Sequence, residues 1–217
     1  MTGGTGVTIR KFEQRDRSSV RRICAGTALM GEPGSAFFDD DEVLADALSL
    51  YFTDHEPQSC LVAEDSGRVV GYLFGAINEK SVERAFSRKI LFPLLVKTLT
   101  RGVFFRRKNL VFFFYFLMSA AKGEFTSPDF SKEYPATLHI NIEKEYRAIG
   151  IGAMLISAYL GYLKGLGVAG VHFATVSEKA GTFFAGQGFS LLSRGRRTYF
   201  RYFLHKEITL HIYGMKL

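Results

Sequence analysis

A short glycine-containing motif is the part of this sequence whose residue types most clearly imply chemistry. It spans residues 147–152, reads RAIGIG, and is followed by apolar residues at helical spacing. Two glycines at the start of a helix let a ligand approach the backbone closely. The first N–H groups of a helix have no internal partners, and its dipole makes that end partly positive. The motif therefore predicts a site for a phosphate-like anion.

Two patterned segments flank this motif and would position it. Leu138, Ile140 and Ile142 alternate with polar residues, which is the two-residue period of a half-buried strand. Beyond the motif, apolar residues follow the spacing of one helical face: Ile151, Met154, Leu155, Ala158 and Tyr162. The order is therefore strand, glycine loop and amphipathic helix.

This arrangement resembles the acetyl-coenzyme A loop of the GNAT acetyltransferases, which has the pattern Arg-x-x-Gly-x-Gly between a strand and a helix. A second strand at 170–176 and a further helix follow it. The segment after them resembles the family's closing pattern of Asn, Ala, Phe-Tyr and Gly-Phe, with Ser177 in the place of the Asn and Phe184 in the place of the Tyr. The residues YPA at 134–136 are typical of one bacterial branch.

The resemblance implies an α+β fold: a mixed, mostly antiparallel central sheet flanked by helices, as a single GNAT domain over residues 1–217. It also implies acetyl-coenzyme A as the cofactor. The pyrophosphate would lie against the N–H groups of residues 147–153, and the pantetheine arm would pair with the central strand as an additional strand does. The implied cofactor-binding residues are Ile140, Asn141, Ile142, Arg147, Ala148, Ile149, Gly150, Ile151, Gly152, Ala153, Ser177, Ala180, Phe183 and Phe184.

The family's chemistry is direct attack of an amine on the thioester, but the usual proton-transfer residues are absent here. Ala136 and Leu138 stand where the family commonly has Glu or His, and Phe184 replaces the Tyr that protonates the leaving thiolate. The catalytic candidates are the nearest titratable residues, His139, Glu143 and His172. Each histidine has a structural interpretation in the core, and the glutamate has one as a solvated charge at the strand end. No metal site is expected.

Composition limits the classes of protein that the chain can belong to. It has 217 residues, is 47% hydrophobic and carries a net charge of +7. Cys24 and Cys60 lie in apolar segments and not at metal-ligand spacing, which predicts buried reduced thiols in a cytosolic protein. The first residues lack the apolar segment of a secretion signal, and no stretch reaches the roughly 18 apolar residues of a membrane span. We therefore expect a cytoplasmic protein, and the resemblance at residues 134–136 implies a bacterial one.

The remaining elements follow the order of the GNAT fold. A first strand at 7–12 precedes two helices, for which Asp16 and the acidic residues at 39–41 are the expected N-caps. The turn signal at 64–67 then predicts a hairpin. The C-terminal part is expected to form a strand at 189–192, a basic turn at 194–197 and a final strand at 208–213.

Residues 79–134 exceed the minimal version of this fold, so we expect them to form a helical insertion. They contain eight phenylalanines between Phe86 and Phe116, in two expected helices at about 83–99 and 103–121. The N-terminal half of the insertion, residues 80–108, holds nine basic residues and one acidic residue. The net charge of this segment accounts for the whole net positive charge of the chain.

Three interpretations of the insertion stay open. It is a helical hairpin packed on the domain or on a second copy of the chain, a lid over the acceptor site, or a membrane-surface element with basic anchors. Nucleic-acid binding has only the charge in its favour, because no recognition motif is present.

The function that the sequence favours is acetyl-coenzyme A-dependent N-acetyltransfer to a small-molecule or peptide amine. The missing acid and base leave a second hypothesis, a catalytically weak acyl-coenzyme A-binding sensor or scaffold. A third is a protein that docks on a membrane or a partner through the insertion. A homodimer is compatible with the phenylalanine-rich segment. No pattern in the sequence identifies the acceptor.

Overall fold

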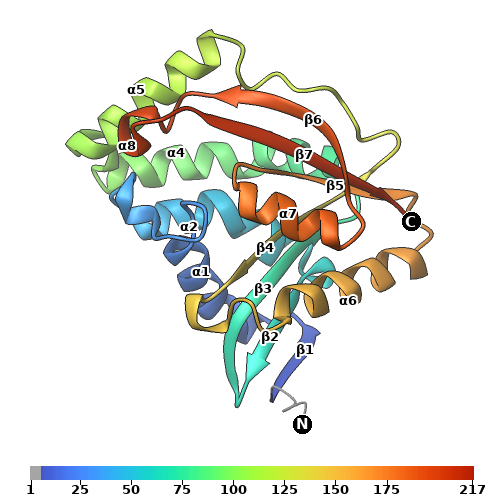
Figure 1. Ribbon diagram of the computed structural model, residues 1–217. Helices are drawn as coiled ribbons and strands as arrows, with labels where there is room; N and C mark the ends of the chain where they lie inside the picture. The colour runs from blue at the N-terminus through green and yellow to red at the C-terminus, as the bar shows by residue number, and fades with distance from the viewer. Residues whose placement is uncertain (1–5) are drawn as a thin grey trace.

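A seven-stranded mixed sheet organises the structure, a computed structural model that describes residues 6–217 (Figure 1). The strands are β1 (Val7–Lys11), β2 (Leu61–Asp65), β3 (Arg68–Ala76), β4 (Ala136–Ile142), β5 (Gly170–Thr175), β6 (Ser190–Arg197) and β7 (Ile208–Lys216). Their order is β1-β2-β3-β4-β5-β7-β6, and only the β4–β5 pair is parallel. This topology confirms the α+β, mostly antiparallel fold that the sequence predicts.

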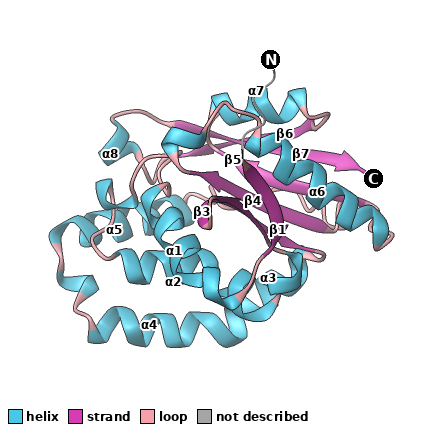
Figure 2. Ribbon diagram, turned by 90° about the horizontal axis from the view of Figure 1, so that it is seen from below, coloured by secondary structure: helices cyan, strands magenta, loops and turns pink. Residues whose placement is uncertain are grey.

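Helices cover both faces of the sheet. They are α1 (Arg17–Gly26), α2 (Asp41–Leu50), α3 (Glu79–Ala85), α4 (Leu91–Thr100), α5 (Arg107–Ala121), α6 (Ile151–Gly165), α7 (Glu178–Gly186) and α8 (Arg201–Leu204). Figure 2 shows the sheet between α6 and α7 on one side and α1 and α2 on the other. A turn of π-helix at Phe86–Ile90 joins α3 to α4, so the chain is helical from Glu79 to Thr100.

Helix α6 packs over the strands through a face that differs slightly from the predicted one. Its buried residues are Ile151, Leu155, Ile156, Tyr159 and Leu163. Met154, which the sequence placed on this face, is 39% exposed. The helix is apolar on more than one side, so spacing alone did not fix which stripe would be buried, and packing against the sheet decided it.

Tyr159 fixes the position of α6 on the sheet. Its ring is fully buried, and its hydroxyl donates to the backbone oxygens of Thr137, at 2.9 Å, and Ala76, at 3.2 Å. Gly75 makes room for the ring, because a Cβ there would lie 2.3 Å from a ring carbon and 2.5 Å from the Ser59 oxygen. These contacts fix the position of α6 relative to β4, and with it the position of the glycine loop at the start of the helix.

The N-terminal helices begin differently from one another. Asp40 caps α2, since its side chain accepts a hydrogen bond from the N–H of Val43 at 3.0 Å, as predicted. Asp16 does not cap α1 with its side chain. The Arg10 guanidinium instead donates two hydrogen bonds, of 2.7 and 2.8 Å, to the Asp16 carboxylate, and the backbone N–H of Glu13 donates to the same carboxylate. Asp16 therefore stands at the predicted N-cap position of α1, but its carboxylate pairs with Arg10 and not with the first turn of the helix.

The predicted basic turn at 194–197 is also wrong, because these residues continue β6. Strand β6 pairs with β7 through Arg197, which lies opposite Ile208. The backbone of the arginine segment thus finds its hydrogen-bond partners in a sheet ladder. The run of basic residues suggested a turn, but backbone pairing with β7 extends the strand to Arg197.

Helices α3, α4 and α5 come from the segment that exceeds the minimal fold. Helix α3 starts at Glu79, four residues earlier than predicted, because Asn78 caps it by accepting from the N–H of Lys80 at 3.0 Å. Helix α4 lies against α2, to which Lys97 and Arg101 connect it through ion pairs. No helix among residues 6–217 is long and apolar enough to cross a bilayer.

Both cysteines are buried free thiols, as predicted. Cys24 and Cys60 pack with Tyr72 and Phe74 between the sheet and α1. Burial raises the pKa of Cys24 to about 11 and that of Cys60 to about 12, so both remain protonated and unreactive near neutral pH.

Candidate active site

Strands β4 and β5 separate soon after they begin, which opens the sheet at its centre (Figure 1). They are in parallel register only at Ala136 opposite Val171 and Thr137 opposite His172. Strand β5 stays paired with β7 along its length, and β4 stays paired with β3. The edge of β4 beyond Thr137 therefore faces an opening instead of a neighbouring strand.

The polar backbone groups of β4 that face this opening can be assigned from its pairing with β3. The N–H of Glu143 donates to the Val70 oxygen at 2.9 Å, so hydrogen-bonded positions alternate back along β4 from that pair. By this alternation Ile140 and Ile142 direct their backbone groups away from β3. Arg147 Nε donates to the oxygen of Ile142 at 2.9 Å, while the groups of Ile140 lie beyond the two residues at which β4 pairs with β5.

The glycine loop presents a row of N–H groups next to this edge. Ala148 and Gly150 both have positive φ, of 62° and 94°, and Gly150 is the N-cap of α6. Across the described part of the chain, no protein acceptor is recorded for the N–H groups of residues 148–153. The first turn of α6 has no acidic residue. Such a turn binds anions through its unpaired N–H groups and the helix dipole.

The two glycines of the loop differ in their surroundings. A Cβ on Gly150 would meet open space, so only the backbone angle restricts this position. A Cβ on Gly152 would lie 3.0 Å from the ring of Phe183 and 3.6 Å from Ile142. The first glycine therefore shapes the loop, and the second allows α6 to pack closely against its neighbours.

The Arg147 side chain bonds to two backbone oxygens outside the glycine loop. Its Nε donates to the Ile142 oxygen, and its Nη2 donates to the Gly31 oxygen at 2.8 Å. The backbone N–H of Arg147 donates to the Lys144 oxygen at 3.3 Å. The sequence placed Arg147 among the cofactor-binding residues, and its contacts in the structure tie the end of β4 to the connection between α1 and α2.

The predicted residues around α7 fall into three different environments. Ser177 caps the helix, because its hydroxyl accepts from the N–H of Ala180 at 3.3 Å. Phe183 is 37% exposed and lies beside Gly152. Phe184 is 4% exposed and packs against Phe173 with ring centroids 4.0 Å apart. The position expected to hold the family's Tyr is thus filled by a core aromatic ring.

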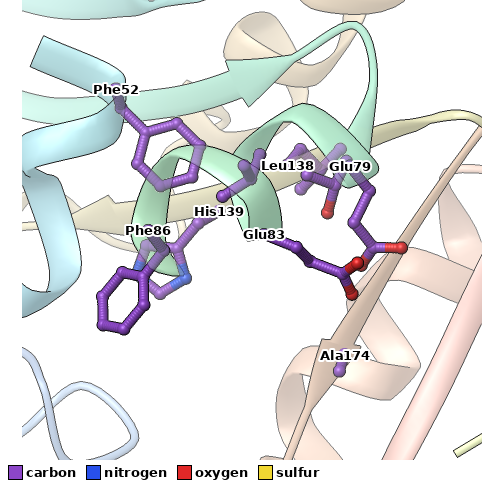
Figure 3. Close-up of a pocket in the computed structure, with 9 residues that line it drawn as sticks. Phe52, Glu79, Glu83, Phe86, Leu138, His139 and Ala174 are labelled. Carbon is purple, nitrogen blue, oxygen red and sulfur yellow. The ribbon is translucent and has the colours of Figure 1, made fainter. Parts of the chain in front are cut away.

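A pocket of about 550 Å³ lies where β4 and β5 separate (Figure 3). It is lined by Phe52, Glu79, Val82, Glu83, Phe86, Thr137, Leu138, His139 and Ala174. Helix α3 and the turn after it form one wall, so the segment that exceeds the minimal fold contributes directly to the pocket. In Figure 3 the carboxylates of Glu79 and Glu83 lie on one side and the rings of His139 and Phe86 on the other.

His139, one of the three catalytic candidates, lies in this pocket as a neutral side chain. Its Nε2 is 3.0 Å from the Asn141 side-chain amide, which also donates to the Tyr72 hydroxyl at 2.8 Å. The residue is exposed toward the pocket, and desolvation by the surrounding protein lowers the pKa of its ring. A lowered pKa makes the ring a weaker proton acceptor.

His172, the second candidate, is buried next to the pocket and bonded at both ring nitrogens. Nδ1 lies 2.6 Å from the Tyr134 oxygen, and Nε2 lies 2.9 Å from a carboxylate oxygen of Glu79. Burial acts to lower the pKa of His172, but the bonds to Glu79 and to backbone oxygens outweigh it and raise the pKa.

Glu143, the third candidate, lies at the opposite end of β4 from the pocket and does not line it. Its carboxylate contacts Arg22 at 2.5 Å and Arg68 at 2.6 Å, and its side chain is 9% exposed. The expectation of a solvated charge is corrected, because two guanidinium groups enclose it. These contacts anchor the end of β4 and leave no free oxygen for proton transfer.

Sequence reasoning missed Glu79 and Glu83, the two carboxylates of the pocket. They are four residues apart on α3, which places them on one helical face. The predicted start of this helix at about residue 83 left Glu79 outside it. The signal that could have found it was the N-cap residue Asn78 followed by an acidic first turn.

Solved structures match this chain over nearly its whole length. The crystal structure of SsHAT has a TM-score of 0.70 and 21% identity, covering 97% of this chain and 98% of that one. A polyamine N-acetyltransferase from Drosophila melanogaster has a TM-score of 0.62 and 14% identity, covering 97% and 100%. A GNAT superfamily phosphinothricin acetyltransferase from Sinorhizobium meliloti, in complex with acetyl-coenzyme A, has a TM-score of 0.57 and 16% identity, covering 98% and 89%.

The chain therefore has the GNAT acyltransferase fold, which confirms the fold that the sequence motif predicts. No sequence-family model and no curated protein matches the chain. The bacterial branch suggested by residues 134–136, and the division of the chain into one domain with an insertion at 79–134, stay predictions.

Proposed function

We propose that this protein is an acetyl-coenzyme A-dependent N-acetyltransferase. The observation that carries the proposal is the juxtaposition of an open β4 edge with the unpaired N–H groups of residues 148–153. The pyrophosphate fits the second feature by charge and hydrogen bonding, and the amides of the pantetheine arm fit the first. Matched solved structures with acetyl-coenzyme A in the same fold support this assignment.

Acetyl-coenzyme A supplies an activated acyl group that an amine nitrogen attacks directly. The pocket beside the separation of β4 and β5 is suited to hold that amine, because it adjoins the end of the open edge. Its aromatic walls, Phe52 and Phe86, and its two carboxylates favour a cationic small-molecule amine over a neutral or anionic one. Solved structures of polyamine and agmatine N-acetyltransferases share the fold and support this class of acceptor.

The proposal is tested by incubating the purified chain with acetyl-coenzyme A and single amines while free thiol is measured. The panel contains aliphatic diamines, agmatine, amino acids and peptides with free N-termini. We expect thiol release that depends on a cationic amine and is matched by an acetylated product in mass spectrometry. Binding of acetyl-coenzyme A without release for any amine would favour the sensor or scaffold hypothesis instead.

A specific surface supports a second candidate function, docking on an anionic membrane. Residues 84–123 contain nine basic residues and no acidic residue. Large apolar side chains of α4, α5 and the turn between them are exposed: Leu91, Phe92, Leu95, Val96, Leu99, Phe105, Leu110, Phe114 and Leu117. We call these nine residues the apolar outer face. Phe92 is 73% and Phe105 77% exposed, which is costly in water unless another phase covers them.

The charge around the apolar outer face favours anionic lipid as its partner. Arg88, Lys89 and Arg107 are exposed and, within residues 6–217, have no recorded ion pair. Two copies of the chain meeting through this face would bring these like charges together, whereas anionic headgroups would neutralise them.

This candidate predicts that the protein pellets with vesicles containing anionic lipid at low salt and less so with neutral vesicles. The variant Phe92→Ser/Phe105→Ser should lose at least half of the bound fraction, because it removes the two most exposed rings. Tyr202→Ser, which removes an exposed ring outside the face, is the matched control. Equal pelleting of the double variant, or no pelleting of the wild type, would contradict membrane docking.

A further inference from the structure

We propose that Glu79 accepts the proton of the acceptor amine and that the buried His172 holds Glu79 in position for this step. The inference rests on the proposed acetyltransferase function and assigns the base that the sequence lacks on the central strand. Its support comes from the placement of the two side chains at the pocket and from the hydrogen bonds around them.

Glu79 is fixed at the rim of the pocket by its own backbone. It is the first residue of α3, and its N–H donates to the Pro135 oxygen at 2.8 Å, immediately before β4. This bond ties the start of the helix to the residue before β4, next to the two residues at which β4 and β5 are paired. The side chain is 34% exposed and lines both the 550 Å³ pocket and its smaller neighbour of about 380 Å³.

His172 can orient Glu79 because its other nitrogen is already committed. A backbone oxygen only accepts hydrogen bonds, so the 2.6 Å contact with Tyr134 places a hydrogen on Nδ1. Nε2 then faces the Glu79 carboxylate at 2.9 Å, and one proton is shared in that contact. The His172 side chain is 7% exposed, so packing prevents the ring from turning away.

The charged groups facing this pair leave Glu79 as the best proton acceptor. Lys80 and Asp129 border the smaller pocket and pair with each other at 3.1 Å. Glu83, one helical turn further, is exposed and has no recorded ion pair among residues 6–217, so nothing holds its carboxylate in one orientation. The other pocket base, His139, has its Nε2 occupied by Asn141.

The proposed step conserves protons and electrons. The ammonium group of the acceptor gives one proton to the free oxygen of Glu79, which leaves a neutral amine nitrogen. The nitrogen lone pair then forms the new C–N bond, and the electron pair of the C–S bond leaves with sulfur. Glu79 releases this first proton to water. The acylated nitrogen then gives up a second proton through Glu79, and the leaving sulfur takes up one, so nitrogen loses two protons, sulfur gains one and the net reaction releases one proton.

The experiment compares Glu79→Gln, His172→Asn and Glu83→Gln in steady-state kinetics as a function of pH. Glu79→Gln should lower kcat at pH 7 by about a hundredfold or more, the usual effect of removing a general base. Its rate should then rise about tenfold per pH unit, because free amine must form without help. His172→Asn should lower kcat less, by about tenfold, with KM for acetyl-coenzyme A unchanged. Glu83→Gln should change mainly KM for the amine.

A readout on the free protein tests the pair without turnover. In NMR titrations, the pKa of His172 should lie above its ordinary value in the wild type and should fall in Glu79→Gln, because the carboxylate that holds the proton is gone. The pKa should be unchanged in Glu83→Gln.

Glu79→Gln with near-normal kcat and an unchanged pH profile would overturn the inference, as would an equal loss of kcat in Glu83→Gln. Either result in an active wild type would leave the acetyltransferase function intact. A wild type that transfers no acetyl group to any amine would instead contradict the proposed function.

Discussion

Gly150→Asp is expected to abolish binding of acetyl-coenzyme A. Gly150 has φ of 94° at the N-cap of α6, where a side chain costs about 1–2 kcal/mol of backbone strain. The larger effect is electrostatic, since the new carboxylate would stand among the N–H groups that are to hold the pyrophosphate. We expect at least a hundredfold loss of affinity, measured by isothermal titration calorimetry.

Two variants separate charge, strain and general damage in this prediction. Gly150→Asn has nearly the same shape without the charge and tolerates the left-handed conformation, so it should weaken binding far less. Gly161→Asp places the same charge on an exposed, open position of α6 and should bind as the wild type does. Unchanged affinity in Gly150→Asp would remove the glycine loop from the site.

Gly75→Ala is expected to cause the largest loss of stability. The added methyl group would lie 2.3 Å from the ring of the buried Tyr159 and 2.5 Å from the Ser59 oxygen, and neither neighbour is a flexible chain end. Overpacking of this kind costs about 3 kcal/mol, the upper end of its usual range. For a chain of this length the melting temperature should fall by roughly 6–12 °C.

The matched control is Gly161→Ala, which makes the same substitution on the exposed side of α6. It should raise stability by about 0.5–1 kcal/mol, because alanine favours a helix over glycine. A melting temperature of Gly75→Ala within 2 °C of the wild type would show that Tyr159 does not fix α6 to β3 and β4 as described.

Local patterns were sufficient to predict the strand, the glycine loop and the helix around residues 138–165. Their periods and their glycines act within one segment, so the sequence alone carries them. The resemblance of that segment to a known loop implied that a pantetheine arm pairs with the central strand, and the short β4–β5 register at Ala136 and Thr137 leaves the edge of β4 open for such pairing. The buried face of α6 was less well predicted, because its apolar residues fit more than one stripe.

The proton-transfer residues were not predictable in the same way, because they depend on contacts between distant segments. Glu79 becomes significant only when His172, from another strand, lies 2.9 Å from it. Glu143 was a candidate because it directly follows the central strand, but Arg22 and Arg68 enclose its carboxylate in the fold. Neither outcome has a signature in the local sequence.

A crystal structure of the chain with acetyl-coenzyme A is the most direct measurement of the central claim. We expect the pyrophosphate oxygens within hydrogen-bond distance of the N–H groups of residues 148–153. The pantetheine arm should pair with Ile140, and the acetyl group should lie next to the pocket that Glu79 lines. Coenzyme bound elsewhere, or density showing the loop closed over a β4 edge that no ligand pairs with, would contradict the account.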